Sequence, residues 1–139
     1  MPHLRRMHQG RLWLLNSGTG EFGWIDPADG RFTPVAFCPG YARGLSFIGQ
    51  SAVVGLSRAR ENRTFGGLPL EGALKAHDAD ARTGLLVIDL ASGQITDWVR
   101  IEGVIDELFD VAALPGVRNP SAIGIKGTDI GRVLSIEPG

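Results

Sequence analysis

The chain has 139 residues, 43% of them hydrophobic and 21% charged, which is the composition of one globular domain. Its net charge of −1 gives no electrostatic reason to expect nucleic acid or an anionic membrane as a partner. Its single cysteine excludes an intrachain disulfide and a cysteine-based zinc cluster.

The N-terminal stretch MPHLRRMHQGRLWLL contains basic residues, but its apolar run is too short for a signal peptide. We therefore expect a cytoplasmic protein. Gly18, Gly20 and Gly23 follow that run at the spacing of a dinucleotide-binding turn. Such a turn needs a helix directly after it, whereas EFGWIDPADG is typical of a strand and a hairpin. We interpret the glycines as part of a β-hairpin.

Short β-type runs recur through the rest of the chain, separated by clusters of Gly, Pro, Asp and Ser. They include FGWID, FTPVAF, GLSFIG, AVVGLS, GLLVIDL, ITDWVRI, ELFDVAAL, AIGI and RVLSI. This pattern predicts an all-β fold. Within it, Cys38 is expected to be a small buried hydrophobe.

The runs repeat. A constant offset of 63 residues places Ile25 on Ile88 and Gly30 on Gly93, so that both copies share a strand, an Asp-x-x-x-Gly turn and a second strand. Continued without gaps, the same offset places Arg43 on Asp106. An offset of 40 places LWLLNS (12–17) on AVVGLS (52–57).

Repeats of four short strands are typical of a β-propeller. We expect residues 1–139 to form a propeller fragment of about three blades: residues 4–37, residues 43–101 with a long loop at 58–83, and residues 105–139. The third blade lacks its outer strand, and we expect the chain to be the C-terminal half of a longer propeller. Open strand edges would then favour self-association. The three tryptophans are expected to pack between blades.

The repeat alignment places His3, Arg43 and Asp106 in the loops that connect successive blades, with Glu107 beside Asp106. A convergent histidine, arginine and carboxylate set can bind a small polar or anionic molecule at a propeller channel. The alternative is a structural ion pair between Arg43 and Asp106 or Glu107. Both interpretations remain open at this point.

The loops inside the blades supply a second candidate set. Asn16 and Ser17 begin the NSGTGE loop of the first blade, where they face a ligand or satisfy their own turn. In the second blade the loop is the insertion 58–83, whose basic start includes Arg60. Leu70 is one of the apolar residues expected to anchor this insertion as a lid or contact surface. The alternative is a solvated basic loop.

Enzyme motifs are scarce, because the sequence has neither a Gly-x-Ser-x-Gly elbow nor a Walker loop. No metal ligands are assigned and no cofactor is expected. Calcium or magnesium held by oxygen atoms of Asn16, Glu107 and Asp110 is the weaker alternative, as in some propeller hydrolases and lactonases.

Several motifs together resemble a bacterial family of uncharacterised, propeller-like proteins known as DUF4915 or TIGR03032. They are MPH, GRLWLLNSGTGEFGWID, PGYARGLSFIG, VGLSRARENRTFGGLPLE and VIDELFDVAALPG. The resemblance covers about residues 1–126 and corresponds to the C-terminal part of longer members, although PHLRR departs from their PHSPR. It implies no established activity. The sequence therefore predicts a binding or interaction module for a small polar molecule or a protein partner, with a metal-assisted hydrolase or an inactive gene fragment as alternatives.

Overall fold

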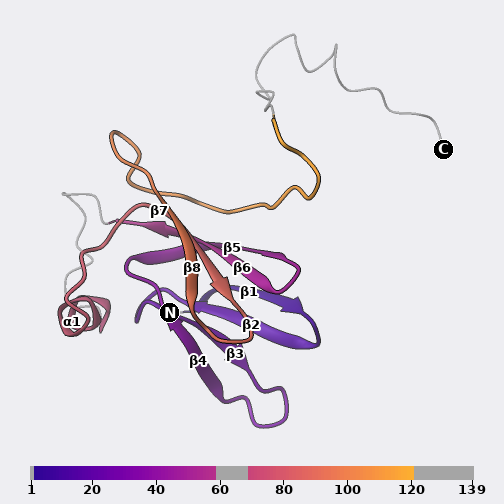
Figure 1. The fold of residues 1–139 in the computed structure, drawn as a ribbon. Coiled ribbons are helices and arrows are strands. Elements are labelled where there is room, and N and C mark those ends of the chain that lie inside the picture. Colours follow the sequence, from indigo (N-terminus) through magenta and orange to yellow (C-terminus); the bar gives the residue numbers. More distant parts are fainter. Residues whose placement is uncertain (1, 59–68, 121–139) are drawn as a thin grey trace, which may run out of the picture.

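The computed structural model of the chain describes residues 2–58 and 69–120, with side chains from residue 4 onward. Within them the chain forms two four-stranded antiparallel sheets in which the strands pair in chain order. The all-β expectation is thereby confirmed (Figure 1). The first sheet comprises β1 (Pro2–His8), β2 (Arg11–Asn16), β3 (Glu21–Ile25) and β4 (Phe32–Phe37). The second comprises β5 (Tyr41–Ile48), β6 (Ser51–Ser57), β7 (Gly84–Asp89) and β8 (Ile95–Arg100).

The first three strands of the two sheets have the same registers. Leu12 pairs with Ile25 in the first sheet, and Ala52 pairs with Ile88 in the second. These pairs reproduce the offsets of 40 and 63 residues that the sequence indicates.

The hairpins between the third and fourth strands repeat in detail. The amide of Gly30 donates to the carbonyl of Asp26 at 2.8 Å, and Gly93 donates to Asp89 at the same distance. Both glycines have positive φ, of 69° and 73°. The aspartate side chains accept from backbone amides of their own turns. The Asp-x-x-x-Gly turn is therefore confirmed, with the aspartate capping it and glycine supplying the left-handed conformation.

The core lies between the two sheets. Trp13 and Phe22 of the first sheet stack with ring centroids 5.0 Å apart. Cys38 is fully buried, as expected. The tryptophans are not alike, however, because Trp13 is 2% exposed whereas Trp98 is 62% exposed on β8. The expectation that all three pack between sheets is wrong for Trp98, since β8 is an outer strand exposed along its whole length. The second sheet contributes Ala42, Leu45, Ala52, Val54, Leu56, Leu86 and Ile88 to this core.

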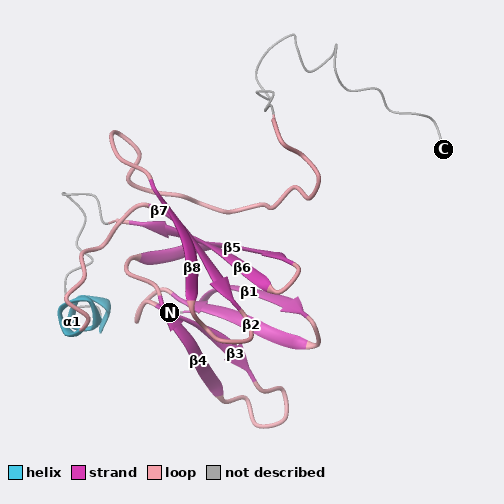
Figure 2. Cartoon of the chain, viewed as in Figure 1, coloured by secondary structure: helices cyan, strands magenta, loops and turns pink. Residues whose placement is uncertain are grey.

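Part of the insertion at 58–83 is helical. Helix α1 (Pro69–Ala76) lies beside the sheets with Glu71 in its first turn and Lys75 in its last, a charge order that suits the helix dipole (Figure 2). Leu70 is fully buried, and its amide donates to the carbonyl of Gly18 at 2.9 Å. Leu70 thus anchors the insertion, as expected, but through a helix rather than an irregular loop.

The third unit differs from expectation. The described residues after β8, 101–120, contain no strand, and residues 121–139 of the expected third blade lie outside the description. The segment 106–113 nevertheless packs along the second sheet, because Val111 lies against Gly44 and Gly55 and the amide of Ala113 donates to Ser46 Oγ at 3.0 Å. Among the described residues, no helix is long and apolar enough to cross a membrane.

Candidate functional site

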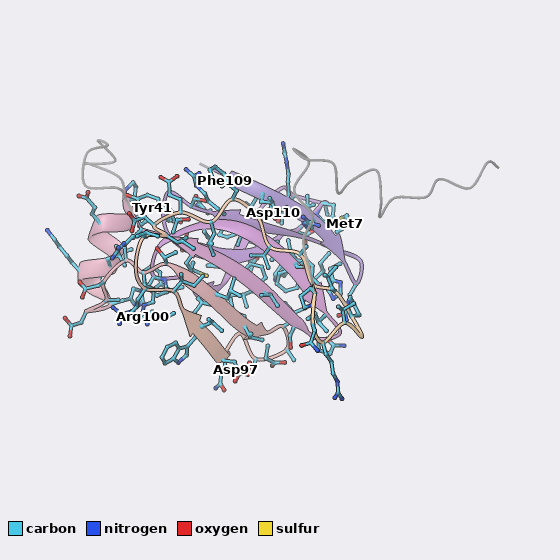
Figure 3. The ribbon with its side chains drawn as sticks, turned by 90° about the horizontal axis from the view of Figure 1, so that it is seen from above. Met7, Tyr41, Asp97, Arg100, Phe109 and Asp110 are labelled. Carbon is cyan, nitrogen blue, oxygen red and sulfur yellow. The ribbon has the colours of Figure 1, made fainter. Side chains whose placement is uncertain are left out.

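Most of the candidate residues gather at one end of the sheets. There β2 and β6 end, and β1 and β5 begin, as the pairs Pro2–Asn16 and Tyr41–Ser57 show. We call this end the strand-end face. In Figure 3, Tyr41, Phe109, Asp110 and Met7 lie along one side of the molecule, and Asp97 and Arg100 of β8 lie along the opposite side.

His3 and Arg43 occupy corresponding irregularities of β1 and β5. The register shifts between Pro2 and Leu4, and again between Ala42 and Gly44, so each residue is the extra one in a bulge. Bulges re-aim side chains and recur beside functional sites. Arg43 is half-buried, and its guanidinium lies 6.0 Å from the ring centroid of Phe109. The side chain of His3 is outside the description.

Two serines in corresponding positions join neighbouring segments. Ser17 Oγ, at the end of β2, donates to the carbonyl of Ala42 in β5. Ser57 Oγ, at the end of β6, donates to the carbonyl of Leu108 at 3.2 Å and accepts from its amide at 2.8 Å. Both serines are buried. The Ser17 hydroxyl therefore joins the two sheets.

These contacts correct the alignment of the third unit. The carbonyls of Ala42 and Leu108 accept hydrogen bonds from serines at corresponding positions, so these two residues are equivalent. The residue after each is then equivalent too, and Arg43 corresponds to Phe109 rather than to Asp106. The connection after β8 is three residues longer than the one after β4, because Leu108 follows Arg100 by eight residues whereas Ala42 follows Phe37 by five. A gapless alignment could not detect this insertion.

Asp106 has a different cationic partner from the expected one. Its carboxylate oxygen lies 2.5 Å from Nε of Arg58, and its carbonyl accepts from the amide of Arg58 at 3.0 Å. The hydroxyl of Thr83 donates to the same carbonyl at 2.9 Å. The sequence suggests an ion pair between Arg43 and Asp106 or Glu107. In the structure, Asp106 forms its ion pair with Arg58 instead. Glu107 follows it on the same segment, and Arg60 lies outside the described residues.

Asn16 has a clear local role, since its carbonyl accepts from the amides of Thr19 and Gly20 and closes the β2–β3 hairpin. This confirms that Gly20, with φ of 75°, belongs to a hairpin rather than to a nucleotide-binding turn. Asp110 forms an ion pair with Arg6 at 3.4 Å and accepts from the amide of Val111. In the described ranges, no group of three His, Cys, Asp or Glu side chains is placed to hold a metal ion.

Sequence reasoning missed a groove beside helix α1. It has a volume of about 380 Å³ and lies between the helix and β4. His77 stacks on Phe37 with centroids 4.1 Å apart, and Thr19 Oγ1 donates to Glu21 at 2.6 Å. Burial and the nearby Glu71 carboxylate raise the pKa of Tyr41, at the start of β5. No motif in the sequence predicts the groove, because one of its walls is a helix that forms within the insertion.

A comparison with protein families supplies one match. The model of a family described as a domain of unknown function, DUF4915, matches residues 1–123. The comparison with curated proteins gave no match.

Proposed function

The chain belongs to the DUF4915 family, and we propose that it is a propeller-type binding module that takes a small polar or anionic molecule at its strand-end face. The observation that carries the proposal is the repeated bulge, in which His3 of β1 and Arg43 of β5 hold equivalent positions on the first strand of each sheet.

The packing of the segments supports a propeller arrangement. In a propeller each four-stranded unit packs face to face on the next. Here β5 packs beside β1 and β2, and the segment 106–113 packs on β5 and β6. The serine contacts to Ala42 and Leu108 repeat this relation, so the segment after β8 takes the place on the second sheet that β5 takes on the first.

The chemistry of Arg43 supports a polar or anionic ligand. A guanidinium presents several donors in a fixed plane, which suits carboxylates and phosphates. The ring of Phe109 supports one side of this group without using its donors. Asp106, which pairs with Arg58, and Glu107 lie on the segment that leads to Phe109, and we include them in the proposed site.

Ligand-observed NMR with a panel of small carboxylic acids, phosphate esters and polyols tests the proposal. We expect at least one compound to bind the native chain and to lose most of its affinity with Arg43→Gln. Arg31→Gln is the matched control, because Arg31 pairs with Asp29 in the exposed β3–β4 turn. The proposal fails if no compound binds, or if every compound that binds is retained by Arg43→Gln.

A further inference from the structure

A small hollow of about 150 Å³ opens where β6 ends, β7 begins and β8 ends. Three arginines contribute to its lining: Arg58 after β6, Arg82 before β7 and Arg100 at the end of β8. Glu102 is the only carboxylate among the lining residues that the structure describes, which also include Ala81, Thr83, Ile101 and Gly103. The lining of the hollow therefore has an excess of positive charge.

The two carboxylates that pair with these arginines do not neutralise the excess positive charge. Arg58 pairs with Asp106 at 2.5 Å, and Arg100 pairs with Glu102 at 3.1 Å. The second pair is weak because both its side chains are more than half exposed. Among the described residues, the three arginines that line the hollow thus have two carboxylates as ion-pair partners, those of Asp106 and Glu102. Like charges repel when they gather in this way, and an anion between them relieves the repulsion.

The backbone around the hollow is held firmly. Thr83 is 2% exposed, its hydroxyl donates to the carbonyl of Asp106, and its carbonyl accepts from the amide of Ile101 at 2.9 Å. The amide of Arg82 donates to the carbonyl of Pro39 at 3.2 Å. These bonds hold the chain segments that carry Arg82 and Arg100. A preformed arrangement lowers the entropy that ligand binding costs.

We propose that this arginine hollow binds a small oxyanion, phosphate or carboxylate, through Arg82 and Arg100. Arginine donates paired N–H groups to two oxygens of such an anion, and the size of the hollow suits a single anionic group. Arg43 is not among the residues that line the hollow, although both proposed sites lie at the strand-end face and Asp106 pairs with Arg58 of the hollow. In Figure 3, Arg100 lies on the side of the molecule opposite Phe109, the ring beneath Arg43.

Titration of the ¹⁵N-labelled full chain with inorganic phosphate, at ionic strength held constant with sodium chloride, tests the site. We expect saturable shifts of the amides of Thr83, Ile101 and Gly103. Arg82→Gln and Arg100→Gln should each weaken binding about tenfold, the loss typical of a charge-assisted hydrogen bond. Arg31→Gln removes the same charge from a distant turn and should leave the affinity unchanged. A parallel titration with acetate distinguishes a phosphate from a carboxylate preference.

The outcomes distinguish this site from the ligand site proposed at Arg43. Weaker phosphate binding at the amides of Thr83, Ile101 and Gly103 in Arg82→Gln and Arg100→Gln, with Arg31→Gln unaffected, supports the hollow. Tighter binding of acetate at the same amides also supports it and assigns a carboxylate. Absence of saturable shifts, or equal weakening by Arg31→Gln, overturns the proposal. Weakening by Arg43→Gln alone overturns it too, since the anion would then lie beside Arg43.

Discussion

Ser57 and Leu108 hold each other by two hydrogen bonds, although 51 residues separate them. The serine hydroxyl accepts from the leucine amide and donates to the leucine carbonyl, and Ser57 itself is 1% exposed. This reciprocal contact fastens the segment after β8 to the second sheet.

We expect Ser57→Ala to lower the free energy of unfolding by about 1–3 kcal/mol, because it leaves the amide and carbonyl of Leu108 unpaired at a poorly hydrated position. Urea denaturation followed by circular dichroism measures this change. Ser92→Ala, in the exposed β7–β8 turn, is the control for loss of a serine hydroxyl and should cost less. An equal loss of unfolding free energy in the two variants would contradict a stabilising role of the Ser57–Leu108 contact.

Val111 and Gly55 also hold this segment on the sheet. A Cβ at position 55 would lie 2.7 Å from Cγ2 of Val111. Gly55→Ala should therefore destabilise the chain by about 1–3 kcal/mol, the usual cost of overpacking. Adding Val111→Ala removes the clashing methyl group and should restore part of the loss. A double-mutant cycle in urea measures the coupling, and purely additive effects would argue against the contact.

Gly72 is the opposite case, since nothing lies within 4 Å of a Cβ built at this position of helix α1. Gly72→Ala should stabilise the chain by about 0.5–1 kcal/mol, because alanine loses less backbone entropy than glycine in a helix. The same denaturation measurement applies. A destabilised Gly72→Ala variant would show that the helix does not persist in solution.

The sequence was sufficient for the sheets but not for the site. Local chemistry determined the hairpins: Asp89 and Gly93 form their turn from neighbours in the chain, so a motif could predict it. The partner of Asp106 depends on an insertion of three residues and on where the segment after β8 lies against β6. Such long-range placement leaves no periodic signal. The groove beside α1 and the arginine hollow were missed for the same reason.

Burial raises the pKa of the Cys38 thiol from 9.0 to about 12. The folded chain therefore retains the proton at pH values where the unfolded chain loses it. Stability is unaffected by this thiol below pH 9 and falls as the pH rises from 9 towards 12, at up to about 1.4 kcal/mol per pH unit. We expect Cys38→Ala to show a shallower loss of stability over that window. Urea denaturation from pH 8 to pH 11 measures the slopes, and parallel slopes would refute the prediction.

The outer strand β8 should make the chain self-associate. All six of its residues are exposed, and they include Ile95, Trp98 and Val99. An outer strand presents unpaired backbone groups, and apolar side chains beside them favour pairing with another copy. We expect light scattering to give a mass above that of the monomer, rising with protein concentration. Val99→Lys should shift the mass towards the monomer, because charge on an outer strand opposes pairing, whereas Ser92→Lys adds the same charge in a turn and should not. A native chain that stays monomeric at every concentration would disprove the prediction.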